Sequence, residues 1–215
     1  MKSLTLNLLL ASIAVLYSIA GSSSADAHDW SGAYGGISVS LHSGKNEYFL
    51  DGVLFRDSSF RNPDTRAGSM LGAHFGYRFQ AGSFVFGPEF STHHGALKMK
   101  NAPENKIDNY QQAVVKLGYA TDRFLTSGGL GYFKAKIKPE CFKECGKSRA
   151  SGPVYLVALD YLINENITLG AAVQHRRFEN VVLNNAYSPA VGAWFPGFAV
   201  DGKDTSLEIR LGFKF

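Results

Sequence analysis

Apolar and polar residues alternate along the last nine residues of the chain, LEIRLGFKF. The apolar positions are Leu207, Ile209, Leu211, Phe213 and Phe215. A period of two predicts a β-strand with one apolar face and one polar face. Similar stretches occupy residues 30–42, 70–80, 83–90, 112–119, 123–137, 153–163 and 167–178. The sequence therefore predicts eight strands, with the facing of the Gly-rich fifth stretch less clear than the others.

The predicted connections alternate between short and long. Three of them cover residues 80–82, 120–122 and 164–166, whereas the other four cover residues 43–68, 91–109, 138–152 and 179–203. A chain that crosses a wall repeatedly, with tight turns on one side and long loops on the other, has this asymmetry. Transmembrane β-barrels show it, and an even strand count brings both ends of the chain to one side.

Charged residues on the polar face separate a membrane barrel from a soluble β-sandwich, whose apolar face would be its core. Small residues are interleaved there with single charges of both signs, at Arg78, Glu89, Lys116, Asp160, Arg176, Glu208 and Arg210. An eight-stranded barrel has an interior that side chains fill, and buried charges have to pair. Aromatic residues at the ends of the apolar face fit an interfacial girdle, namely Tyr77, Phe79, Phe84, Tyr119, Phe124, Tyr161 and Phe215. We therefore predict an all-β fold, an eight-stranded antiparallel up-and-down transmembrane β-barrel with these seven charges in its lumen.

Composition excludes two other classes. The mean hydropathy of −0.08 excludes a bundle of membrane helices, but it is compatible with strands that alternate. The formal charge is +4, from 22 basic and 18 acidic residues that are scattered along the chain. Nucleic-acid binding would need a basic stripe, so we expect no nucleic-acid partner.

The first 27 residues have the pattern of a secretory signal peptide. Lys2 precedes an apolar run from Leu4 to Ala20, and Ala25-Asp26-Ala27 has the small-x-small form of a cleavage site. A transmembrane anchor is the alternative, but the apolar run is short and interrupted. We predict a signal peptide at residues 1–27 and a barrel at residues 28–215.

Three blocks of the sequence resemble the small opacity-type, OmpA-like eight-stranded barrels of the porin family of surface antigens. They are WSGAYGGISVS, VVKLGYATDRFLTSGGLGYFKAKI and VALDYLINENITLGAAVQHRRFE, and the terminal Phe completes the pattern. The resemblance implies the outer membrane of a Gram-negative bacterium, extracellular long loops and periplasmic mature termini. It also implies that Ile209, Leu211, Phe213 and Phe215 form the signal read by the barrel-assembly machinery. Despite the family name, we expect no wide pore, since side chains fill so narrow a barrel.

Few residues suggest chemistry. Cys141 and Cys145 have a C-x3-C spacing that predicts a short disulfide in an exported protein, and a metal or haem pair is the alternative. His93 and His94 are either two exposed polar residues or a site for haem or a metal; some members of the resembling family bind haemin. His42 and Ser43 lack a partner for hydrolysis. We expect no metal, no cofactor apart from haemin as a ligand, and no enzyme.

Two classes of function remain open from the sequence. The first is a surface barrel that stabilises the envelope and contacts outer-membrane lipid, lipopolysaccharide or host molecules. The second is a haemin-binding surface receptor. Titration of the purified protein with haemin would separate the two classes.

Overall fold

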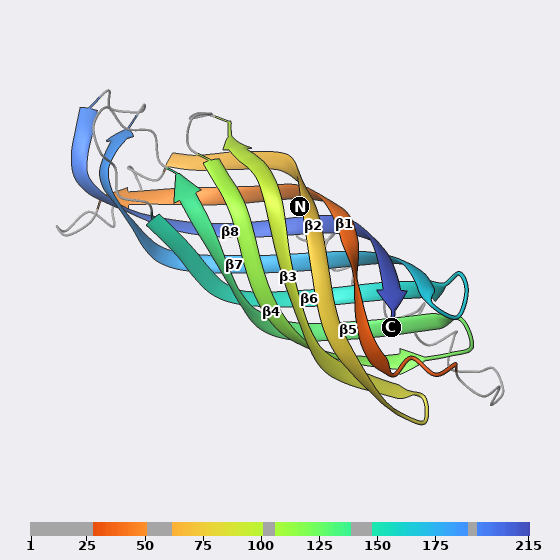
Figure 1. The fold of residues 1–215 in the computed structure, drawn as a ribbon. Helices are drawn as coiled ribbons and strands as arrows, with labels where there is room; N and C mark the ends of the chain where they lie inside the picture. Colours follow the sequence, from red (N-terminus) through yellow and green to blue (C-terminus); the bar gives the residue numbers. More distant parts are fainter. Residues whose placement is uncertain (1–27, 51–61, 101–105, 139–147, 189–192) are drawn as a thin grey trace, which may run out of the picture.

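The structure, a computed structural model, describes residues 28–50, 62–100, 106–138, 148–188 and 193–215, so the predicted signal peptide lies outside it. It contains eight strands, β1 (Gly32–Leu50), β2 (Asn62–Ala81), β3 (Phe84–Met99), β4 (Lys106–Ala120), β5 (Phe124–Lys138), β6 (Ser148–Leu162), β7 (Ile167–Ser188) and β8 (Ala193–Lys214). Each strand pairs antiparallel with the next, and β8 pairs with β1 to close the barrel (Figure 1). The prediction of an eight-stranded antiparallel barrel is confirmed. Within the described ranges, no helix is long and apolar enough to cross a membrane.

Three short connections lie together at one end of the barrel, which we call the turn end (Figure 1). They join β2 to β3, β4 to β5 and β6 to β7. Gly82 in the first has a φ of 59°, a left-handed conformation that glycine adopts without steric cost. In the third, the Asn164 side-chain oxygen accepts hydrogen bonds from the backbone N–H groups of Asn166 (3.0 Å) and Ile167 (2.8 Å). We call the opposite end the loop end.

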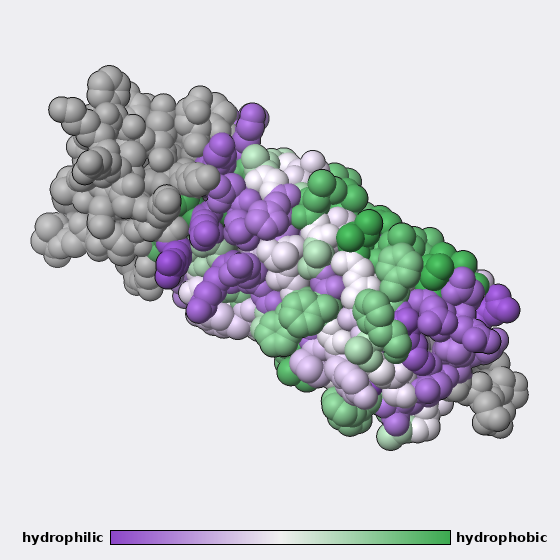
Figure 2. Space-filling view, in the orientation of Figure 1, coloured by the Kyte–Doolittle hydropathy of each residue, from purple (hydrophilic) through white to green (hydrophobic). Residues whose placement is uncertain are grey.

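Large apolar side chains cover the middle of the outer wall (Figure 2). On β5 this apolar band runs from Phe124 to Tyr132. At about 3.3 Å per residue and a tilt of about 40°, that stretch spans about 20 Å along the membrane normal, near the roughly 25 Å usual for such barrels. Outward aromatic rings mark the turn-end edge, where Phe84 meets Tyr119 and Phe124 meets Tyr161. The outer wall therefore has the pattern of a lipid-facing surface.

Four strands continue well past the ends that the sequence predicted. Residues 43–50 and 62–69 extend β1 and β2, and residues 179–188 and 193–203 extend β7 and β8, so much of the predicted long loops is strand. The alternation continues there with reversed polarity. On β5, Lys134 and Lys136 are exposed on the outside, whereas Ala135 and Ile137 are buried inside. The reversal follows from the surroundings, because beyond the apolar band the outer wall no longer faces hydrocarbon.

The terminal strand lies where the sequence placed it, and it makes contacts with both of its neighbours. Val39 of β1 is opposite Ile209, and Leu169 of β7 is opposite Leu211. The side chain of Phe215 is 84% exposed, while its backbone N–H donates to the Ala33 carbonyl (3.0 Å). The apolar side chains at 209, 213 and 215 point outward, as those of the girdle do.

The segment before β1 is fixed at the turn end. The Trp30 backbone N–H donates to Gln80 Oε1 (2.6 Å), and the Trp30 ring is buried. Ser31 donates to Asp29 through both its backbone N–H and its hydroxyl group. These hydrogen bonds lower the pKa of the exposed Asp29 carboxyl group, because they stabilise its charged form.

Candidate functional site: the packed lumen

The inner wall of the barrel carries nine buried charged side chains among the described residues. Seven are those that parity placed on the inner face, and Arg66 and Asp204 are added to them. Five are cations and four are carboxylates. Since an unpaired buried charge is costly, the pairing of these groups decides whether the lumen is stable.

Glu89 of β3 is the centre of the group nearer the turn end. Its Oε2 accepts hydrogen bonds from Arg210 Nη2 (2.6 Å), the Tyr34 hydroxyl (2.8 Å) and Lys116 Nζ (3.3 Å). These partners come from β8, β1 and β4, so one carboxylate connects four strands across the interior. Glu89 itself is 2% exposed. We call this set the Glu89 cluster.

Arg78 and Asp160 form a separate pair at the same end. Arg78 Nη2 lies 3.1 Å from Asp160 Oδ2. The Arg78 guanidinium also lies over the rings of Tyr34 (4.0 Å) and Trp30 (5.4 Å). The stacked rings and the carboxylate stabilise the buried cation from two sides, which ties β2 to β6 and to the N-terminal segment.

Asp204 of β8 is the centre of a second group, nearer the loop end. Its Oδ2 lies 2.9 Å from His42 Nδ1 and 3.1 Å from Arg176 Nη1, and its Oδ1 lies 3.8 Å from Arg66 Nε. Arg66 also donates to Asn46 Oδ1. We call this set the Asp204 cluster; it joins β1, β2, β7 and β8.

Two glutamines connect the two groups. Arg176 Nε donates to Gln112 Oε1 (3.1 Å), and Gln112 Nε2 donates to Gln174 Oε1 (2.8 Å). Gln174 in turn donates to Glu208, and Glu208 Oε1 lies 4.0 Å from Arg210 Nε. The inward polar side chains therefore form one chain of contacts along the lumen rather than isolated pairs.

Ser40, His42 and Asp204 have the arrangement of a hydrolytic triad. Ser40 Oγ lies 2.8 Å from His42 Nε2, and His42 Nδ1 lies 2.9 Å from Asp204 Oδ2. A triad needs access for a substrate carbonyl, yet the three residues are at most 4% exposed and Tyr110 stacks on the His42 ring at 5.6 Å. In this conformation the three residues act as a structural relay. The partner of His42 is thus Asp204, and the adjacent serine, Ser43, points outward.

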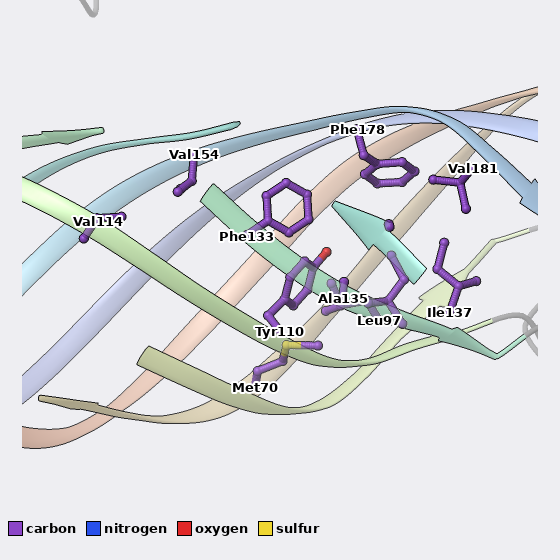
Figure 3. Packing of buried hydrophobic residues seen from close by; sticks show 12 residues of the cluster. Met70, Leu97, Tyr110, Val114, Phe133, Ala135, Ile137, Val154, Phe178 and Val181 are labelled. Carbon is purple, nitrogen blue, oxygen red and sulfur yellow. The ribbon is translucent and has the colours of Figure 1, made fainter. Parts of the chain in front are cut away.

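Apolar side chains cap the polar interior at both ends. At the turn end they are Trp30, Val85, Ala120, Leu125 and Leu162. At the loop end a larger cluster contains Met70, Leu97, Ile107, Tyr110, Val114, Phe133, Ala135, Ile137, Ala150, Val154, Phe178 and Val181. Figure 3 shows the rings of Tyr110, Phe133 and Phe178 turned toward one another inside the barrel. Water and ions would have to displace both caps to pass along the axis.

The structure places the other predicted site residues as follows. His93 and His94 follow each other on β3 and therefore point to opposite faces. His93 is fully buried, with Nε2 3.4 Å from Glu208 Oε2, whereas His94 is exposed on the outside. The structure does not bring the two imidazoles to one ligand. Cys141 and Cys145 lie outside the described residues, so their disulfide stays a prediction. Among the residues described, no group of three or more His, Cys, Asp and Glu side chains could hold a metal ion.

Sequence reasoning missed two charges and the loop-end cap. Arg66 and Asp204 fell into segments that were predicted as loops, although both continue the inward parity of their strands. Position 204 is in step with 206, 208 and 210, and position 66 with 68 and 70. Following parity past the end of the apolar face would have found both residues.

A closed antiparallel barrel with an apolar outer band and a charged, packed interior is a membrane-spanning barrel of the outer-membrane type. The family model of the outer membrane protein beta-barrel domain matches residues 12–215. The chain belongs to this family, and its membrane is therefore the outer membrane of a Gram-negative bacterium.

Solved structures share the fold at low sequence identity. The outer membrane protein OprG from Pseudomonas aeruginosa has a TM-score of 0.57 and 16% identity, with 86% of this chain and 97% of that chain covered. Ail, the attachment invasion locus protein of Yersinia pestis, has a TM-score of 0.43 and 13% identity, with coverage of 86% and 99%. Neisserial surface protein A has a TM-score of 0.39 and 14% identity, with coverage of 83% and 97%. A search of the curated proteins finds no match.

Proposed function

We propose that the protein is a surface barrel of the outer membrane that stabilises the envelope and contacts outer-membrane lipid and host molecules, and that it is neither a wide pore nor an enzyme. The observation that carries this proposal is the lumen. Its nine buried charges pair across the interior, and an apolar cluster covers them at each end. A barrel filled in this way leaves its outer wall and its loops as the surfaces on which it acts.

The outer wall supports an orientation with the loop end outside the cell. Beyond the apolar band, the exposed side chains of the loop end include seven cations, which we call the basic belt: Lys45, Lys98, Lys134, Lys136, Arg149, Arg177 and Lys203. Glu179 is an exposed carboxylate in this zone. The short turns instead carry both signs, with Asp122, Arg123 and Glu165. Because the outer leaflet presents phosphate groups, a basic loop end fits that leaflet, and the mature termini are then periplasmic.

Haemin capture is the weaker alternative. A haem receptor would use the His93 and His94 imidazoles together as iron ligands. Their side chains point to opposite faces of β3, and His93 lies beside Glu208 in the packed lumen. The geometry therefore favours the surface-barrel function over a haemin site at this pair.

Conductance in planar bilayers tests the proposal. The purified wild-type barrel is expected to give small or absent conductance. Truncating the Glu89 cluster with Glu89→Ala, Lys116→Ala and Arg210→Ala together removes the central pairing, and conductance should rise. A control that replaces the outward Val115 and Leu117 with Ala changes the same strand without touching the lumen, and it should behave as the wild type. A large, stable wild-type conductance would contradict the packed lumen and the function proposed from it.

A further inference from the structure

The outer face of β4, β5 and β6 carries three cations at the loop-end edge of the apolar band. Lys134 and Lys136 of β5 and Arg149 of β6 are exposed there. In the strand register Lys136 is directly opposite Arg149, and Lys134 is opposite Gln111 of β4. Like charges that face each other across strands destabilise a sheet, so an anion between them would be stabilising.

These cations line a hollow of about 270 Å³ on the outer face. Its other lining residues among those described are Asn109, Gln111 and Ala135, and no carboxylate is among them. Asp108 precedes Asn109 at a β-bulge and does not line the hollow. Two ammonium groups, one guanidinium and two side-chain amides form a set of hydrogen-bond donors suited to a phosphate group.

A second hollow, of about 490 Å³, lies next to the first on the side of the apolar band. Ala113 of β4 is opposite Phe90 of β3 and Tyr132 of β5, so a small side chain lies between two rings. Phe90 stacks on Phe75, with ring centroids 5.4 Å apart. The Tyr132 hydroxyl donates to Ser151 Oγ (3.1 Å), which holds the other ring in place. This hollow is an apolar groove with fixed aromatic walls.

The two hollows share Gln111 and Lys134 in their linings. A phosphate-sized basic site therefore adjoins an apolar groove, at the height where headgroups meet hydrocarbon. We propose that this is a binding site for one phosphorylated lipid of the outer leaflet. Its phosphate lies among Lys134, Lys136 and Arg149, and one acyl chain lies over Ala113. The proposal rests on the orientation given under the proposed function, with the loop end outside.

The remainder of the basic belt helps to identify this position as the site. On the other side of the barrel, Lys45, Lys203 and Arg177 also form a row of neighbouring cations on β1, β8 and β7. There Arg177 already pairs with Glu179, with 2.6 Å between Nη2 and Oε1. That row has a carboxylate partner of its own, so it provides a control with an equal number of cations.

Native mass spectrometry of the purified barrel in a non-ionic detergent tests the site, with diphosphoryl lipid A as the probe. Lys134→Gln, Lys136→Gln and Arg149→Gln together should weaken lipid binding about tenfold or more, as expected for the loss of charged hydrogen bonds. The control Lys45→Gln, Arg177→Gln and Lys203→Gln removes the same charge and should leave the affinity within about twofold of wild type. Equal losses in the two triple variants would show non-specific attraction and overturn the site.

The groove and the source of the phosphate are tested separately. Ala113→Phe fills the groove on a lipid-facing position, where an apolar side chain leaves the barrel intact, and it should weaken lipid A binding about tenfold. A dephosphorylated lipid A should bind wild type as weakly as diphosphoryl lipid A binds the Lys134, Lys136 and Arg149 variant. If inorganic phosphate displaces the lipid at comparable concentrations, or if Ala113→Phe binds as wild type does, the lipid site is wrong. Binding in detergent depends on neither conductance nor orientation, so its failure is distinguishable from failure of the proposed function.

Discussion

Replacing Glu89 by Gln tests the idea that charge pairing holds the lumen together. The substitution keeps the shape of the side chain and removes its charge. The Arg210 guanidinium and the Lys116 ammonium group lie 2.6 Å and 3.3 Å from the lost charge, and both are buried. The variant therefore leaves two buried cations without their main counter-charge, while an amide oxygen can still accept from Tyr34.

The expected loss follows from the cost of an unpaired buried charge. Removing one partner of a buried ion pair typically destabilises a protein by about 3–5 kcal/mol, a large fraction of a typical unfolding free energy of about 5–15 kcal/mol. We expect Glu89→Gln to lose about that amount. Adding Lys116→Met, which removes one of the two uncompensated cations at similar volume, should recover about half of the loss, since apolar replacement of a buried pair is often neutral.

Urea unfolding of the barrel in phospholipid vesicles, followed by tryptophan fluorescence, measures these free energies. Glu165→Gln in the exposed turn between β6 and β7 is the matched control, and it should stay within about 0.5 kcal/mol of wild type. If Glu89→Gln changed the unfolding free energy by less than about 1 kcal/mol, or if Lys116→Met made the double variant worse, the pairing argument would be refuted.

Three further outcomes are expected. Gly131→Ala places a methyl group 2.0 Å from a backbone carbonyl oxygen of β4, so it should destabilise the barrel by about 1–3 kcal/mol in the same unfolding assay, whereas Gly128→Ala meets its first neighbour at 3.9 Å and should be tolerated. Deletion of Phe215 should lower the amount of heat-modifiable barrel in isolated outer membranes, and assembly at wild-type levels would contradict its role in recognition. A protease site inserted after Lys100 should be cleaved in intact cells and one at Glu165 should not, and the opposite pattern would invert the orientation.

The strand count and the facing of the membrane-spanning residues were predictable because they depend on local parity. Side chains alternate strictly along a strand, so a run such as the one ending in Leu211 and Phe213 assigns every residue to a face. Lipid on one side and packed side chains on the other then require the charges to point inward. For that reason Glu89 and Arg210 could be assigned to the interior without any structure.

The strand ends were not predictable in the same way, because the polarity of the two faces reverses where the wall leaves the hydrocarbon. Beyond Tyr132 on β5, the outward residues become Lys134 and Lys136 and the inward ones Ala135 and Ile137. A search for one continuous apolar face ends at this point, although the strand continues. The same effect hid Asp204, which lies inside the barrel on a segment that was predicted as loop.

By itself, the sequence determined an eight-stranded wall and the side of it on which each charge lies. Only the tertiary structure decided which charges meet. Parity fixes a face, whereas a contact across the lumen also depends on the height of each side chain, and that height is set by the stagger of all eight strands when β8 pairs with β1. His42 therefore meets Asp204, 162 residues away, and Glu89 meets Arg210, 121 residues away. It is this closure that converts scattered single charges into a packed interior, and it also brings Lys134, Lys136 and Arg149 to one hollow on the outer wall.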